Sequence, residues 1–203
     1  MHYLVTGASG FIGKRLVRAL LARPGAVVYF VLRNPSAERV RSLRAYWNAD
    51  AKRAIPIEGD LTQPALGVAR SNIRKLAGKI DHVFHLAAIY DLEADAQAEM
   101  TANVEGTRHA VQCAEAIKAG CFHHVSSIAA AGMYDGVFRE DMFVEATKLD
   151  HPYFASKHLA EKVVRSACSI PWRVYRPGIV VGDSQTGEMD KIDGPYYFFK
   201  LIQ

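Results

Sequence analysis

Tyr153 and Lys157 are the residues whose types and spacing most clearly suggest chemistry, in the segment Tyr153-Phe154-Ala155-Ser156-Lys157. In a helix, residues four apart lie on one face, about one turn from each other. A phenol, with an ordinary pKa of about 10, exchanges protons poorly at neutral pH, and a nearby ammonium group favours its ionised form. The pair therefore fits proton transfer to or from an oxygen atom.

Such a pair suits the reduction of a carbonyl group. A hydride that reaches the carbonyl carbon leaves negative charge on the oxygen, so a donor at that oxygen stabilises the transition state and delivers the proton. Tyr153 is the expected donor and Lys157 the neighbouring charge. Because this spacing is common by chance, the hypothesis depends on the elements that would position the pair.

A glycine-rich turn follows the first expected strand and opens the first expected helix. Gly7 allows a tight turn, Gly10 lets the backbone approach a pyrophosphate, and Gly13 lets the helix pack closely on the strand. The start of the helix presents free amides and the positive end of its dipole to the phosphates. The context predicts a dinucleotide site. Its expected contacts are Gly7, Ser9, Gly10, Phe11, Ile12 and Gly13.

Short β-branched or aromatic runs alternate with helical stretches, a pattern typical of a parallel sheet with helices on both faces. The predicted strands are His2–Thr6, Val27–Leu32, Ala54–Glu58, His82–Leu86, Cys121–Ser126 and Trp172–Tyr175. The predicted helices are Phe11–Ala22, Ala37–Asn48, Ile73–Ala77, Ala94–Ala119 with a break near Asn103, and Tyr153–Ser166. Right-handed crossovers give the doubly wound order 3-2-1-4-5-6 of a Rossmann fold, which binds ligands beyond the carboxyl ends of its strands.

The pattern changes after the sixth strand. Arg176-Pro177-Gly178 stops the strand, residues 182–194 are polar and turn-rich, and Pro195 to Gln203 are strongly apolar. We expect residues 1–182 to form an α/β nucleotide-binding domain. Residues 183–203 are expected to be the start of a substrate-binding lobe that this chain does not complete.

Composition fits one soluble globular domain of 203 residues, half of them hydrophobic. The net charge of +4 comes from dispersed lysines and arginines, which argues against nucleic-acid binding and suits a phosphate-bearing ligand. The longest apolar run, Ala26 to Leu32, is far shorter than the roughly 20 residues of a membrane-spanning helix. The N-terminus carries no basic-then-apolar leader, so a cytoplasmic protein is expected.

The cysteines and histidines show no metal-ligand spacing along the chain, so no metal site is predicted. The three cysteines are expected to be ordinary thiols of a reducing compartment: Cys113, Cys121 and Cys168. Five histidines are expected to pack in the core or lie on the surface: His82, His123, His124, His151 and His158. His123 and His124 should face opposite sides of one strand.

The motifs occur in the order found in one enzyme family. Together with the GxxGxxG turn and the tyrosine–lysine pair, three stretches resemble the extended short-chain dehydrogenase/reductase family: Asn103–Thr107 in the fourth helix, Ser126–Gly132 after the fifth strand, and Arg176–Gly178 after the sixth. The resemblance implies nicotinamide-dependent oxidoreductase chemistry. It implies catalytic roles for Ser127, Tyr153, Lys157 and Asn103.

The resemblance also implies a separate role for each of these residues. Counting back five positions from Gly132 selects Ser127 over Ser126 for a second hydrogen bond to the carbonyl oxygen. Asn103 resembles the asparagine that anchors a water in the family's proton relay, and Lys157 is implied to hold the nicotinamide ribose. The further cofactor contacts implied are Asp60 and Leu61 with adenine, Ala87 in the small-residue floor, Tyr153, and Pro177, Gly178 and Ile179 at the nicotinamide carboxamide.

The end of the second strand bears on the choice between NADH and NADPH. About 20 residues beyond the glycine turn, a carboxylate would accept from the ribose hydroxyl of NAD, whereas an arginine would pair with the extra phosphate of NADP. The strand ends in Arg33 and Asn34, without an acid. We expect NADPH, with Arg33 on the phosphate through parallel hydrogen bonds and Lys14 and Arg39 as weaker candidates.

A more specific resemblance concerns the substrate. The stretches HVSSIAAAG, FREDMF, KLDHPY and WRVYRPGIVVGDS look like the N-terminal reductase domain of bacterial fatty acyl-CoA reductases, which form fatty alcohols. This implies reduction of a fatty acyl thioester, on CoA or an acyl carrier protein, or of a fatty aldehyde, with a second reductase domain in the full-length protein. Two alternatives stay open: another extended-family enzyme such as a nucleotide-sugar epimerase or dehydratase, or a non-catalytic NADP-sensing module.

Overall fold

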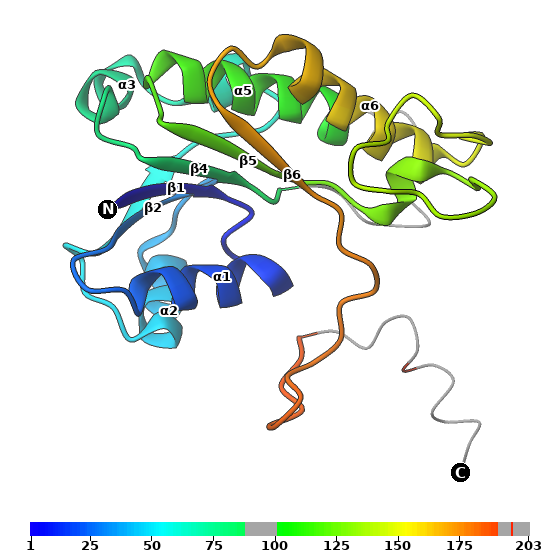
Figure 1. Ribbon diagram of the computed structural model, residues 1–203. Helices are drawn as coiled ribbons and strands as arrows, with labels where there is room; N and C mark the ends of the chain where they lie inside the picture. Colours follow the sequence, from blue (N-terminus) through cyan, green and yellow to red (C-terminus); the bar gives the residue numbers. More distant parts are fainter. Residues whose placement is uncertain (88–100, 191–195, 197–203) are drawn as a thin grey trace.

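The computed structural model describes residues 1–87, 101–190 and 196 (Figure 1). Six parallel strands form one sheet in the order β3-β2-β1-β4-β5-β6, which confirms the predicted Rossmann topology. The strands are β1 His2–Thr6, β2 Val27–Leu32, β3 Ala54–Glu58, β4 His82–His85, β5 Cys121–Val125 and β6 Trp172–Tyr175. β4 and β5 end one residue before the predicted ends, and the other strands have the predicted bounds.

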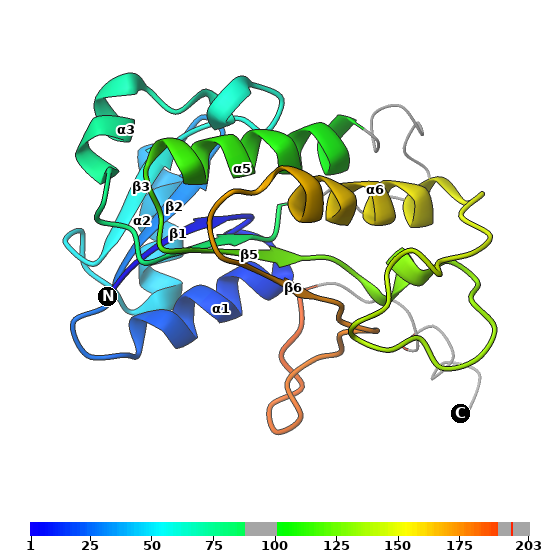
Figure 2. The same ribbon diagram turned by 45° about the horizontal axis from the view of Figure 1, so that its top comes forward.

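Helices cover both faces of the sheet (Figures 1 and 2). α1 Phe11–Leu21 and α2 Ala37–Trp47 lie on one face, and α3 Arg70–Leu76, α5 Gly106–Ala116 and α6 Pro152–Ala167 lie on the other. α3 begins before the predicted Ile73, and the predicted break near Asn103 is a π-helical turn over Thr101–Glu105. The first part of the predicted helix from Ala94 lies outside the described residues. Two 3-10 helices that were not predicted span Pro64–Gly67 and Ile128–Ala131.

The alternation of side chains along each strand builds a core on each face of the sheet. On β1, Val5 packs with Phe30 and Trp47 under α1 and α2, whereas Leu4 packs with Val83 and other residues under the opposite helices. Burying a side chain of this size contributes about 1.5–3 kcal/mol. The Trp47 indole also donates to the carbonyl oxygen of Lys14 at 3.0 Å, which ties α2 to α1.

The chain beyond β6 returns to the face that α1 and α2 cover. Asp190 forms ion pairs with Lys14 at 3.1 Å and with Arg15 at 3.2 Å, and Glu188 accepts a hydrogen bond from the Tyr46 hydroxyl at 2.9 Å. The segment Asp183–Asp190 is therefore held against the first two helices. In the described part of the chain, helices fall short of the length and apolar character needed to cross a membrane.

Candidate active site

The glycine turn brings β1, α1 and the end of β4 into close contact. Gly7 has a φ of +71°, in the left-handed region, and a Cβ there would lie 2.7 Å from the backbone nitrogen of Ala87. A Cβ on Gly13 would overlap the carbonyl oxygen of Gly7. Larger residues at Gly7 and Gly13 would therefore push apart the elements that form the turn.

The start of α1 is suited to an anion. Gly10 is its N-cap residue, and no side chain among the described residues caps the helix through a hydrogen bond. The first turn carries no acidic residue, and the nearest atom to a Cβ built on Gly10 is the Gly7 oxygen at 3.3 Å. The first-turn amides therefore present an uncapped positive end to a ligand, as a dinucleotide pyrophosphate requires.

A cavity of about 490 Å³ adjoins this turn, between α1 and α2. The Arg39 guanidinium donates to the Ser9 hydroxyl at 3.0 Å, and Ser36 caps α2 by accepting from the backbone nitrogen of Arg39 at 3.2 Å. Lys14 also lines the cavity. Arg39, one of the two weaker candidates for the NADP phosphate, thus lies beside the glycine turn, and its guanidinium contacts the predicted cofactor residue Ser9.

Arg33 directly follows β2 and is exposed, and its charge acts on Asp60, which follows β3. Hydrogen bonds from the backbone and hydroxyl of Thr62, and to a lesser degree the charge of Arg33, hold the pKa of Asp60 below its usual range. Leu61 is partly buried, and its carbonyl oxygen accepts from the His109 ring at 2.7 Å. The predicted adenine residues therefore stand at the end of β3, next to the predicted phosphate arginine.

Ala87 is the first member of a buried chain of hydrogen bonds. Its backbone N–H donates to the Thr6 hydroxyl at 3.3 Å, and that hydroxyl lies 2.8 Å from His85 Nδ1. His85 Nε2 lies 3.1 Å from the Thr107 hydroxyl, which donates to the carbonyl oxygen of Asn103 at 2.6 Å. Since Thr107 donates onward, it accepts from His85 Nε2–H, and Nδ1 then accepts from Thr6. Thr6, His85 and Thr107 were not among the site residues predicted from the sequence.

Tyr153 and Lys157 lie in the first half of α6, as their spacing predicts. The Lys157 ammonium is 5.7 Å from the centre of the Tyr153 ring, and the lysine is only 7% exposed. The buried Asn103 amide donates to the Ser156 hydroxyl at 3.2 Å, which donates to the carbonyl oxygen of Tyr153 at 3.0 Å. Asn103 is therefore connected to the first turn of the helix that carries the pair.

The two neighbouring serines have different surroundings. Ser126 is buried, and its hydroxyl donates to the Glu161 carboxylate at 3.2 Å. Ser127 is partly exposed and accepts from the backbone nitrogen of Ala129 at 3.1 Å, which leaves its hydroxyl proton for another acceptor. The geometry thus favours Ser127 for contact with a ligand.

Glu161 is fully buried and connects three elements. Besides Ser126, its carboxylate accepts from Arg165 at 2.8 Å and from Arg176 at 2.6 and 3.0 Å. Burial raises its pKa, but the hydrogen bonds from Arg176 and Arg165 outweigh burial and bring the pKa below the usual value. Glu161 was not predicted from the sequence, although its position four residues after Lys157 places it on the same helical face.

Arg176 leads into the predicted nicotinamide segment. Its guanidinium also donates to the carbonyl oxygen of Met142 at 2.8 Å. The next residue, Pro177, accepts at its carbonyl from the backbone nitrogen of Ile128 at 3.1 Å, directly after Ser127. Ile179 is 73% exposed. The predicted nicotinamide segment therefore begins beside the predicted catalytic serine.

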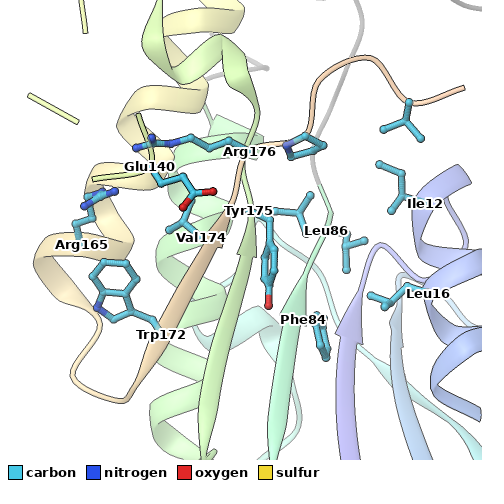
Figure 3. Close-up of a pocket in the computed structure, with 13 residues that line it drawn as sticks. Ile12, Leu16, Phe84, Leu86, Glu140, Arg165, Trp172, Val174, Tyr175 and Arg176 are labelled. Carbon is cyan, nitrogen blue, oxygen red and sulfur yellow. The ribbon is translucent and has the colours of Figure 1, made fainter. Parts of the chain in front are cut away.

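A second cavity of about 980 Å³ opens between α1 and the last strands (Figure 3). Ile12 and Leu16 of α1 line one side, and Phe84 and Tyr175 of the sheet line the other. Pro177 also borders it. The cavity therefore begins at predicted cofactor residues and runs over the apolar face of the sheet.

The parallel sheet, the glycine turn and the helix N-terminus define a Rossmann-type nucleotide-binding domain. A family model described as "Male sterility protein" matches residues 5–203. The chain belongs to this family of NAD(P)-binding reductase domains, within the extended short-chain dehydrogenases/reductases.

Individual relatives align with most of the length of this chain. It is 37% identical over 94% of its length to a subunit of linear gramicidin synthase from Brevibacillus parabrevis, of which it spans 4%. It is 30% identical over 98% of its length to aldehyde reductase lnbA of Aspergillus flavus, of which it spans 21%. The solved terminal R domain from the myxalamid PKS-NRPS biosynthetic pathway superposes with a TM-score of 0.82 at 30% identity, over 95% of this chain and 52% of that one.

Proposed function

We propose that this chain is the NADPH-binding catalytic part of a reductase that converts an acyl thioester, held on an acyl carrier or on CoA, to an aldehyde. A fatty aldehyde is the second carbonyl substrate in this proposal. The observation that carries it is the position of Tyr153, Lys157 and Ser127 beyond the same sheet edge as the uncapped start of α1. A carbonyl reductase needs proton donors and a dinucleotide at one edge.

The cofactor fits the residues present. The amides at the start of α1 and the close-packed glycines suit the pyrophosphate, Asp60 and Leu61 the adenine, and Tyr153 and Lys157 the nicotinamide ribose. Ala87 and the segment Pro177 to Ile179 complete the proposed contacts. NADPH, when bound, supplies the hydride.

The protein's own residues handle the substrate oxygen. Ser127 and Tyr153 donate hydrogen bonds to the carbonyl oxygen, and Tyr153 gives it a proton as negative charge develops. Lys157 stabilises the phenolate that remains, and Asn103 holds the start of α6 through Ser156. With a thioester, the carbon–sulfur bond then breaks and the thiol leaves, so no covalent enzyme intermediate is needed.

A tethered or long-chain acyl group is supported by two observations. The chain spans 4% and 21% of the two curated relatives, so it resembles one part of longer proteins in which a neighbouring domain can deliver the substrate. The apolar cavity of about 980 Å³ offers room for an acyl chain. In this proposal residues 1–182 form the nucleotide-binding domain, and residues 183–203 begin the substrate-binding lobe.

The experiment follows the absorbance of NADPH mixed with full-length protein and a long-chain acyl-CoA, a carrier-bound acyl thioester or a fatty aldehyde. We expect oxidation with at least one of them, and a loss of about 10²-fold or more in kcat for Tyr153→Phe with NADPH affinity preserved. Tyr134→Phe, a change outside the proposed site, is the control. Turnover of a nucleotide sugar without NADPH consumption would instead support an epimerase, and NADPH binding without any turnover a sensor.

The choice of NADPH rests on Arg33 and Arg39. A charge-assisted hydrogen bond contributes about 1.5–3 kcal/mol, so Arg33→Ala or Arg39→Ala should lower the preference for NADPH over NADH by roughly tenfold to a hundredfold. Arg41→Ala is the matched control, because Arg41 is an exposed arginine of α2 outside the cavity lining. Equal ratios of kcat/KM for the two cofactors in wild type and both variants would contradict the assignment.

A further inference from the structure

Three side chains with metal-binding atoms lie together toward the amino ends of two strands, whereas the proposed catalytic residues follow the carboxyl ends. His82 and Cys121 are the first residues of β4 and β5 and are partners in the strand register. His123 follows Cys121 by two positions and therefore points to the same face of the sheet. Spacing along the chain could not show this cluster, because it depends on the pairing of β4 with β5.

The donor atoms of the cluster converge. One ligand atom from each of His82, Cys121 and His123 lies within 4.8 Å of the others. His82 Nδ1 and His123 Nε2 are 2.9 Å apart, a distance at which two imidazole nitrogens share one hydrogen, so at least one lone pair points into the cluster. A tetrahedral zinc site, with bonds of about 2.0–2.3 Å, can form after small rotations of these side chains.

The surroundings hold the two imidazoles in place. The other nitrogen of His123, Nδ1, lies 2.9 Å from the Tyr175 hydroxyl, the kind of outer contact that orients a ligating histidine. Phe84 stacks on His123 with ring centres 4.3 Å apart, and Tyr3 stacks on His82 at 5.8 Å. Figure 3 shows Phe84 and Tyr175 on the side of the sheet that faces the large cavity. The two imidazoles are therefore held in position on the sheet by neighbouring aromatic side chains.

The donor set suits a soft or borderline cation. Imidazole nitrogens and a thiolate sulfur are ligands that zinc prefers, and the Cys121 thiol must lose its proton to coordinate the ion. Cys121 is partly exposed and offers a route for the ion.

We propose that His82, Cys121 and His123 form a binding site for a divalent cation of the zinc class. Two imidazole nitrogens and one thiolate coordinate the ion, and water takes the fourth position. For each ion bound, one proton leaves the Cys121 thiol for solvent, and the hydrogen shared by the two imidazoles moves to the other nitrogen of the ring that carries it. Because the strands are parallel and the catalytic residues follow their carboxyl ends, this ion fastens β4 to β5 and takes no part in carbonyl reduction.

The test is a titration of metal-free full-length protein with Co²⁺ alone. We expect one ion per chain, with a thiolate-to-cobalt absorption band that Cys121→Ser abolishes. Tyr175→Phe, which removes only the outer hydrogen bond, should weaken binding about tenfold or more. Cys168→Ser is the control, because Cys168 is a partly buried thiol outside the cluster.

A second measurement needs no variant. Zn²⁺ should protect Cys121 of the wild-type protein from alkylation, as read by peptide mass spectrometry, far more than it changes the rate at Cys168. The proposal is overturned if the wild type shows no thiolate band and no protection of Cys121. A band that survives in a folded Cys121→Ser variant, or that Cys168→Ser removes, would also overturn it.

Discussion

Two buried hydrogen-bond networks support the proposed site, one next to its cofactor-binding half and one next to its catalytic half. The two networks are built from different chemical groups. Under the nucleotide half, Thr6, His85 and Thr107 link the backbone of Ala87 to that of Asn103 without any formal charge. Under the catalytic half, the Glu161 carboxylate is held by two arginines and Ser126. Both networks connect elements that are distant in sequence.

Because the groups differ, the stability of each network depends on a different condition. In the uncharged network every hydroxyl both accepts and donates, so the order of the hydrogen bonds is fixed by the neutral state of His85. Burial, together with the charges of His124 and Lys157, keeps the pKa of His85 well below its usual value. In the charged network a fully buried carboxylate is stable only because Arg165 and Arg176 compensate its charge.

Breaking the charged network should have the largest effect. Glu161→Leu removes the carboxylate and leaves Arg176, 13% exposed, without its buried partner. We expect the free energy of unfolding to fall by about 3–5 kcal/mol, since Arg176 and the partly buried Arg165 both lose the charge that compensates them. Glu161→Gln, which keeps an acceptor oxygen, should lie between this variant and the wild type. Urea denaturation measures all three proteins.

The control for that prediction is an exposed ion pair. Glu105 pairs with Arg108 at 3.2 Å, and both side chains are nearly half exposed. Glu105→Gln should lower the free energy of unfolding by at most about 1 kcal/mol. If substitutions at Glu161 and Glu105 lowered the free energy of unfolding equally, the burial of Glu161 and its pairing with two arginines would not contribute to stability.

The sequence predicted the elements better than the connections between them. The glycine turn and the strand bounds follow from local patterns, so Gly7, Gly13 and the helix with Tyr153 were placed correctly. Glu161 was missed because a glutamate in a helix is usually solvated, although its spacing from Lys157 was a usable signal. His85 gains its hydrogen bonds only when β1, β4 and α5 meet.

Backbone detail also lies beyond such patterns. The 3-10 segment Pro64–Gly67 holds Ala65 and Leu66 at φ values of 49° and 62°, and Leu66 is completely buried. Non-glycine residues rarely adopt this region, so a local pattern favours other conformations. Tertiary contacts contribute to the geometry here, because the backbone nitrogen of Ala65 donates to the side-chain oxygen of Gln112 in α5 at 3.3 Å.

Breaking the uncharged network should have a smaller effect. Thr107→Val keeps the shape of the side chain but removes the acceptor of His85 Nε2–H and the donor to Asn103. One buried unsatisfied donor costs about 1–3 kcal/mol, which chemical denaturation can resolve. The matched control is Thr147→Val at an exposed position, for which we expect little change. Equal losses at both positions would mean that the chain of hydrogen bonds adds nothing to stability.

The smallest predicted effect is a difference between the two networks in how the free energy of unfolding depends on pH. The pKa of His85 is 6.5 when unperturbed and well below that in the fold, so below pH 6.5 the unfolded chain takes up a proton that the folded protein does not. Stability is therefore fully present well above pH 6.5 and falls as the pH drops, by about 1.4 kcal/mol at pH 5.5 for this group. His85→Gln keeps one donor and one acceptor but cannot titrate.

The measurement compares the free energy of unfolding at pH 7.5 and pH 5.5. His85→Gln should lose about 1.4 kcal/mol less than the wild type between these values. Glu161→Gln should lose as much as the wild type, because the pKa of Glu161 lies below its usual 4.5 and its contribution disappears only at lower pH. If instead Glu161→Gln flattened the pH dependence and His85→Gln did not, the charged network would be the pH-sensitive one. The assignment of the neutral, Nε2-protonated form to His85 would then be wrong.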